Sequence, residues 1–106
     1  MDTSEFQRDA ISTIPKYVVG SSLLSAAVGG MVEEAAEVLG LMNKHLYQGH
    51  RLDQEAMVAE LGDTMRYAAW VCHWLGYGMD EVMRINMERM AERYPNGFEA
   101  ERSINR

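Results

Sequence analysis

Cysteine and proline are nearly absent from this chain of 106 residues, and both absences bear on its structure. Cys72 is the only cysteine, so no intrachain disulfide can form, and the apolar stretch around it predicts a packed thiol. The two prolines, Pro15 and Pro95, fall where helices are expected to end. The sequence also contains no repeats and no low-complexity tract.

Basic runs and long apolar runs are also missing. The 10 Lys and Arg residues against 16 Asp and Glu residues give a formal net charge of −6, which makes nucleic acid and anionic membranes poor partners. No apolar run approaches the length of a membrane span, and the N-terminal stretch MDTSEFQRDA lacks the pattern of a signal peptide. We therefore expect a cytoplasmic protein, and the acidic excess favours a ligand that arrives with cations.

Apolar residues make up 47% of the chain, which excludes a disordered polymer and suits a single domain over residues 1–106. Apolar spacing and end signals predict four helices, at about residues 4–13, 21–47, 53–76 and 79–94, and no segment alternates like a strand. The short connections predict antiparallel neighbours. We therefore expect an all-α protein, an antiparallel helical bundle of about four helices. Because a domain of this size buries only part of its surface, we expect oligomerisation to complete the bundle.

Two adjacent glycines, Gly29 and Gly30, lie inside the second predicted helix. Each costs about 1 kcal/mol relative to alanine in a helix interior. They therefore indicate either a close helix crossing or a break in the helix, and the sequence leaves both possibilities open.

Acidic residues occur on the apolar faces of two predicted helices. Glu34 and Glu37 are three residues apart in the second helix, and Glu60 and Asp63 repeat this spacing in the third. If these helices are antiparallel neighbours, four carboxylates converge, and they cannot all be ionised in a low-dielectric space without compensation. Oxygen ligands in this number suit Mg²⁺ or Mn²⁺, whereas zinc is disfavoured because the group offers neither His nor Cys. The competing interpretation is a solvated helix face, which is common for glutamates at this spacing.

Cationic side chains supply a complementary feature. Asn86, Arg89 and Arg93 share one face of the fourth predicted helix, where arginine donors suit the oxygens of a polyphosphate. Lys44, two turns beyond Glu37, can add a further charge. The competing interpretation pairs the arginines with surface acids. Four aromatic residues could form a base pocket, but core packing is the simpler explanation and no base-reading residue is assigned among Phe6, Tyr67, Trp70 and Trp74.

The acidic motif resembles that of the MazG-like nucleotide pyrophosphohydrolases, within the all-α NTP pyrophosphatase superfamily. The family pattern is Glu-Glu-x-x-Glu, a spacer and then Glu-x-x-Asp. This chain has EEAAE at residues 33–37 and ELGD at residues 60–63. The later stretch INMERMAERYPNGF is also similar to the family. The resemblance covers the chain from about Ala27 to the C-terminus.

This resemblance implies Mg²⁺-dependent hydrolysis of a nucleoside triphosphate, an NTP or dNTP, to the monophosphate and pyrophosphate, with Mn²⁺ as a second candidate metal. It also favours a homodimer or a dimer of dimers. Glu33 becomes a further acid that supports the metal or activates water. The resulting site prediction has metal ligands Glu34, Glu37, Glu60 and Asp63, catalytic acids Glu33 and Glu34, and substrate-binding residues Lys44, Asn86, Arg89 and Arg93.

Two other functions remain open from the sequence. The first is a different pyrophosphohydrolase of the same superfamily, such as a dUTPase-like or phosphoribosyl-ATP-cleaving enzyme. The second is a non-catalytic helical module that binds metal or nucleotide, or that only dimerises. The intact acidic motif argues against the second, since a scaffold has no reason to bury two acid pairs.

Overall fold

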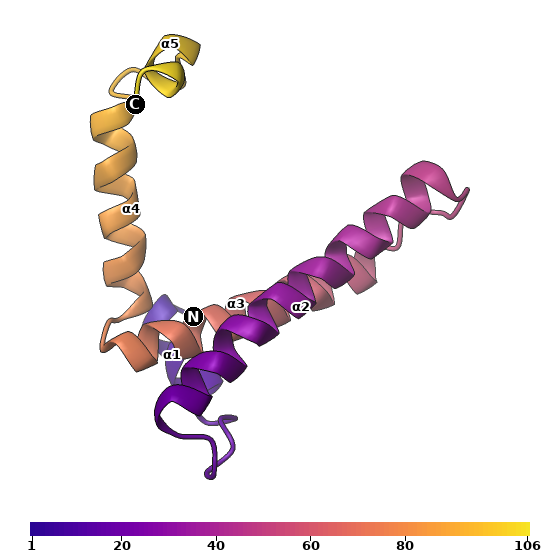
Figure 1. Cartoon of the computed structure of the whole chain (residues 1–106), viewed down its shortest axis with the longest axis vertical. Helices are drawn as coiled ribbons and strands as arrows, with labels where there is room; N and C mark the ends of the chain where they lie inside the picture. The colour runs from indigo at the N-terminus through magenta and orange to yellow at the C-terminus, as the bar shows by residue number, and fades with distance from the viewer.

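The computed structural model describes all residues from 1 to 106 and contains five helices and no strands (Figure 1). The all-α class is confirmed, and the four expected helices lie within a few residues of their predicted bounds. A fifth short helix in the polar tail was not expected. The helices are α1 Thr3–Ile11, α2 Gly20–Tyr47, α3 Gln54–Leu75, α4 Met79–Arg93 and α5 Ala100–Ile104. None of them combines the length and hydropathy needed to cross a bilayer.

Local capping explains several of the helix ends. The Asp2 carboxylate accepts a hydrogen bond from the Glu5 backbone N–H at 2.9 Å and so caps the start of α1. Asp53 caps α3 in the same way through the Ala56 N–H at 3.0 Å, as its position predicted. Gly76 ends α3 in the left-handed conformation, with φ of 79°. These side chains and this glycine satisfy backbone groups that the helices leave unpaired.

Helices α2 and α3 form a long antiparallel hairpin (Figure 1). At one end, the Trp74 indole N–H donates to the carbonyl oxygen of Gly20 at 2.9 Å. Further along, the ring of Tyr67 lies against Gly30. The early part of α2 therefore faces the late part of α3, as antiparallel packing requires.

The apolar core lies where α1 crosses this hairpin. Ala10 of α1 and Trp70 of α3 connect the helix to the hairpin directly, because the buried indole N–H of Trp70 donates to the Ala10 carbonyl oxygen at 2.7 Å. Cys72 is buried in the same cluster, and this burial raises the pKa of its thiol, so the packed-thiol prediction is confirmed. The buried apolar residues of the core are Ala10, Leu23, Ala27, Ala69, Trp70, Cys72 and Met79.

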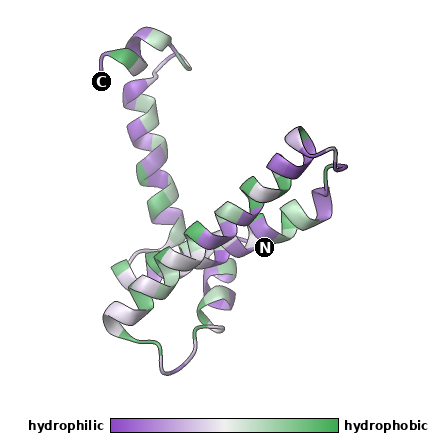
Figure 2. Ribbon diagram, turned by 45° about the vertical axis from the view of Figure 1, so that its right-hand side comes forward, coloured by the Kyte–Doolittle hydropathy of each residue, from purple (hydrophilic) through white to green (hydrophobic).

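Helix α4 leaves this packed body and projects away from α2 and α3 (Figure 1). Met79 is its only buried residue, and hydrophobic positions continue along the rest of it with no second helix beside them (Figure 2). The Cα radius of gyration is therefore 16.9 Å, above the roughly 13 Å of a compact chain of this length. Within one chain, three helices pack together and the fourth does not join them.

The direction of α4 is set by a glutamine from α1. The Gln7 side chain is buried, donates to the Tyr77 carbonyl oxygen at 3.0 Å and accepts from the Met79 N–H at 2.9 Å. These two bonds hold both sides of the turn between α3 and α4. A buried amide with both functions satisfied is costly to displace, so α1 determines where α4 begins.

The adjacent glycines of α2 have different environments. A Cβ on Gly30 would lie 2.6 Å from ring atoms of Tyr67, whereas a Cβ on Gly29 would meet nothing within 4 Å. Helix α2 continues through both positions without a break. Of the two possibilities that the sequence left open, the close crossing is therefore the correct one, and Gly30 is the residue that permits it.

Replacing Gly30 with alanine should destabilise the protein. Overpacking against three ring atoms costs about 3 kcal/mol, which exceeds the gain of about 1 kcal/mol in helix propensity. We expect Gly30→Ala to lower the free energy of unfolding by about 2 kcal/mol. The matched control, Gly29→Ala, should raise it by up to about 1 kcal/mol. Urea denaturation of both variants measures the difference, and equal effects would contradict the assigned crossing.

Candidate functional site

Three carboxylates meet beyond the core, where α2 and α3 continue side by side. Glu34 and Glu37 project from one face of α2, and Glu60 projects from the facing side of α3. One oxygen of each residue lies within 4.8 Å of an oxygen of the other two. The antiparallel register brings Glu60 opposite the α2 pair. We call these three residues the carboxylate group.

The carboxylates perturb one another strongly. Hydrogen bonding with the Glu60 carboxyl is the main cause that raises the pKa of Glu37, and charge repulsion between the two adds to it. Contact with Glu34 is the main cause that raises the pKa of Glu60. Repulsion from Asp63 raises the pKa of both residues further. Repulsion among the carboxylates therefore opposes full ionisation of the group.

Two oxygens of the group are also left without partners. Oε2 of Glu34 and Oε2 of Glu60 are buried and accept no hydrogen bond. Burying such an atom unsatisfied is costly, and more so when it carries charge. A divalent cation would satisfy both oxygens and offset the repulsion. Because the donors are all carboxylate oxygens, the group fits a hard cation such as Mg²⁺ or Mn²⁺.

The other two predicted acids lie around the group. Asp63 is one helical turn after Glu60, close enough to repel Glu37 and Glu60, and it lines a small pocket together with Glu34. Glu33 is exposed on α2 and does not belong to the carboxylate group. The structure thus brings three of the predicted acids together, with Asp63 beside them and Glu33 on the outside.

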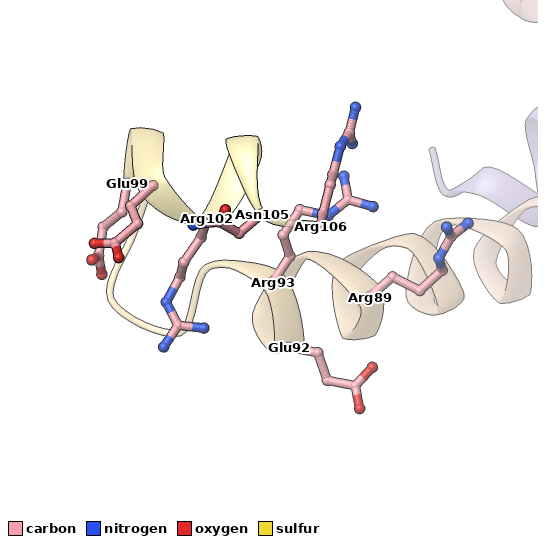
Figure 3. Close-up of a pocket in the computed structure, with 8 residues that line it drawn as sticks. Arg89, Glu92, Arg93, Glu99, Arg102, Asn105 and Arg106 are labelled. Atoms are coloured by element: carbon pink, nitrogen blue, oxygen red, sulfur yellow. The ribbon is translucent and has the colours of Figure 1, made fainter.

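The predicted cationic residues lie elsewhere in the chain. Lys44 is exposed near the end of α2, and Asn86 is exposed on the projecting α4. Arg89 and Arg93 line a separate pocket of about 650 Å³ between α4 and α5 (Figure 3). The remaining residues that line this pocket are Glu92, Glu99, Glu101, Arg102, Asn105 and Arg106. Within one chain, the α4 residues and the carboxylate group are therefore separated.

Sequence reasoning did not single out Arg66. Its guanidinium bonds to the Asp9 carboxylate at 2.8 Å, to the Asp9 carbonyl oxygen at 2.8 Å and to the Thr13 hydroxyl at 2.9 Å. Arg66 also lines the pocket that Glu34 and Asp63 border. The available signal was its position, three residues after Asp63 on the same helix face, since a charge there must find a partner.

The family assignment rests on a match that spans the helices carrying this carboxylate group. The family model described as the MazG nucleotide pyrophosphohydrolase domain matches residues 24–98, well over half of the chain. The chain therefore belongs to the MazG nucleotide pyrophosphohydrolase family, which confirms the resemblance. No match was found among curated proteins or among solved structures. The matched range includes α2 from residue 24 onward and all of α3 and α4, and it leaves out α1 and α5.

The stability of the metal-free protein should depend on pH through Glu37 and Glu60. Both pKa values are raised in the folded state, so this contribution to stability is present below the ordinary glutamate pKa and is lost as pH rises through the raised values. In EDTA, the melting temperature of the wild type should therefore fall relative to that of Glu37→Gln as pH rises from about 4.5 to 7. Thermal melts of both proteins across this range measure the effect. If the melting temperatures of the two proteins changed in parallel with pH, Glu37 would not be repelled by its neighbouring carboxylates.

Proposed function

We propose that this chain hydrolyses a nucleoside triphosphate, an NTP or dNTP, to the monophosphate and pyrophosphate with Mg²⁺, and that Mn²⁺ can replace it. The observation that carries the proposal is the carboxylate group with two buried, unpartnered oxygens, in a member of a pyrophosphohydrolase family. A polyphosphate requires its charge to be neutralised before water can attack, and a cation held by carboxylates meets that requirement. Such an enzyme would act on the cytoplasmic nucleotide pool.

The acids would divide into metal ligands and one proton acceptor. Glu34, Glu37 and Glu60 would hold the metal, and Asp63 would complete the set from the adjoining turn. When bound, the cation supplies charge neutralisation and lowers the pKa of a coordinated water. Exposed Glu33, next to Glu34 in the chain, is free to accept a proton, and with Glu34 it forms the catalytic acid pair of the proposal.

The phosphate-binding residues would come from a second copy of the chain. Asn86, Arg89 and Arg93 lie on α4, whose apolar side chains Met83 and Met87 are exposed. The carboxylate group lies on the α2–α3 hairpin, and Arg66 is the arginine that lines the pocket beside it. Docking α4 on the body of a partner would bury the exposed methionines and bring arginine toward the phosphates. A homodimer or a dimer of dimers supplies this arrangement, and Lys44 would add a charge from the end of α2.

Neutralising Glu37 should remove activity without unfolding the protein. Glu37→Gln keeps the shape, loses one ligand charge and relieves repulsion, so we expect turnover to fall by more than about 100-fold. The increase in melting temperature caused by millimolar Mg²⁺ should largely disappear. The control is Glu55→Gln, because Glu55 is an exposed acid in the first turn of α3. Pyrophosphate release from a panel of NTPs and dNTPs provides the measurement and also separates dUTPase-like from broader enzymes. Near-normal turnover of Glu37→Gln would remove Glu37 from the site.

Replacing Arg89 should affect phosphate binding across subunits. Arg89→Ala should reduce kcat/KM at least tenfold, about 1.4 kcal/mol, equally for different bases, while metal binding without nucleotide stays unchanged. Mixing Arg89→Ala chains with Glu37→Gln chains should restore about a quarter of the wild-type activity, because half of the dimers then contain one intact shared site. Light scattering gives the oligomeric state. A fully active monomer, or mixtures as inactive as their components, would contradict the shared site.

A further inference from the structure

A pocket of about 250 Å³ opens beside the carboxylate group, between the end of α1 and the middle of α3. Glu34 and Asp63 form the side of the pocket nearest the group, and Arg66, Tyr67 and Trp70 continue away from it along α3. Thr13 closes it from the segment after α1. A ligand whose phosphates reach the carboxylate group would therefore have room for its remaining part here. We call this space the α1–α3 pocket.

The aromatic wall of the α1–α3 pocket is held in place. Trp70 is buried, and its indole N–H is fixed by the bond to Ala10. The ring of Tyr67 meets that of Trp70 edge to face, with centroids 4.9 Å apart, and it also lies against the backbone at Gly30. Two aromatic rings that are already ordered can receive a flat ligand without losing further side-chain entropy.

Arg66 brings hydrogen-bond donors to the same pocket. A guanidinium has five N–H donors, and the three bonds to Asp9 and Thr13 use three of them. Two donors therefore remain for a ligand. The Asp9 carboxylate at 2.8 Å already balances the charge of Arg66. An arginine that is paired in this way suits a neutral acceptor, such as a carbonyl oxygen or ring nitrogen, better than a polyphosphate, which needs unpaired positive charge.

The anchors of Arg66 lie outside the part of the chain that matches the family model. That match begins at residue 24, whereas Asp9, Ala10 and Thr13 belong to α1 and the turn after it. The carboxylate group lies wholly within the match. The α1–α3 pocket thus combines a wall from the matched region with a wall from residues that precede it.

We propose that the α1–α3 pocket binds the nucleotide base, with Arg66 donating to an acceptor atom of the base and Tyr67 and Trp70 forming its apolar wall. The inference rests on the proposed function, because it takes the carboxylate group as the site of the phosphates. It makes Arg66 a residue for base binding and leaves metal and phosphate binding to the acids and to α4.

The test compares a nucleotide with the same phosphate chain lacking a base. The ligands are an α,β-methylene nucleoside triphosphate, which resists cleavage at the proposed bond, and inorganic tripolyphosphate, both with Mg²⁺. Calorimetry gives each affinity for the wild type and for Arg66→Met, which keeps an unbranched, flexible stem and removes the donors. If Arg66→Met does not fold, Arg66→Lys keeps the charge beside Asp9 but loses the planar set of donors, and it replaces the first variant.

We expect Arg66→Met to lower the affinity for the methylene nucleotide about tenfold or more. Its affinity for tripolyphosphate should change less than twofold. The control is Asp9→Ala, which removes the ion pair but leaves two of the three bonds that hold Arg66. It should lower stability slightly and change nucleotide affinity much less than Arg66→Met does. In a Trp74→Phe protein, Trp70 is the only tryptophan, and its fluorescence should respond to the nucleotide and not to tripolyphosphate.

The other outcomes separate this inference from the proposed function. If Arg66→Met lost affinity equally for both ligands, Arg66 would contact the phosphates. If it lost affinity for neither, Arg66 would not belong to the site. In both cases the base pocket is overturned while pyrophosphohydrolase activity stands. If Asp9→Ala lost as much nucleotide affinity as Arg66→Met, Arg66 would act only by holding α1. This outcome also overturns the inference. A wild type that binds neither ligand would overturn the proposed function itself.

Discussion

The contact between the Gly30 backbone and the Tyr67 ring lies between the apolar core and the carboxylates, and both depend on it. Because Gly30 has no side chain, the Tyr67 ring of α3 packs directly on the backbone of α2, and the two helices remain in one register. Beyond the contact, the same closeness forces Glu37 and Glu60 together and raises both pKa values. The core on one side must therefore offset a repulsion that the helices create on the other.

A carboxylate group with two buried, unpartnered oxygens is an unfavourable feature for a protein with a small core. Only 9 of the 106 residues are buried, so little apolar packing is available to offset electrostatic costs. A cation would turn the group from a destabilising feature into a stabilising one. The metal proposed for catalysis would then also stabilise the fold, so that folding would be coupled to metal binding.

Helix α1 connects otherwise separate parts of the molecule. Gln7 holds the turn that starts α4, Ala10 accepts the bond that fixes Trp70, and Asp9 binds Arg66. A helix of nine residues thereby sets the direction of the projecting arm and one wall of the α1–α3 pocket. Helix α1 lies outside the range that matches the family model, whereas the acidic motif lies inside it.

The sequence by itself determined what depends on neighbours within one or two helical turns. Capping residues such as Asp53 and stop signals such as Gly76 predicted the helices, and i, i+3 spacing predicted that Glu34 and Glu37 share a face. Family pattern then added the expected chemistry. The short α5 was missed because its polar sequence lacks an apolar stripe.

Only the tertiary structure decided which faces meet. The pairing of Arg66 with Asp9 spans 57 residues, and no local rule predicts a partner at that distance. The separation of Arg89 from the carboxylates also could not be predicted, because it depends on Gln7 holding the turn before α4. Spacing along a helix follows from the geometry of the backbone, whereas the choice between a close crossing and a break at Gly30 required the position of Tyr67 on another helix.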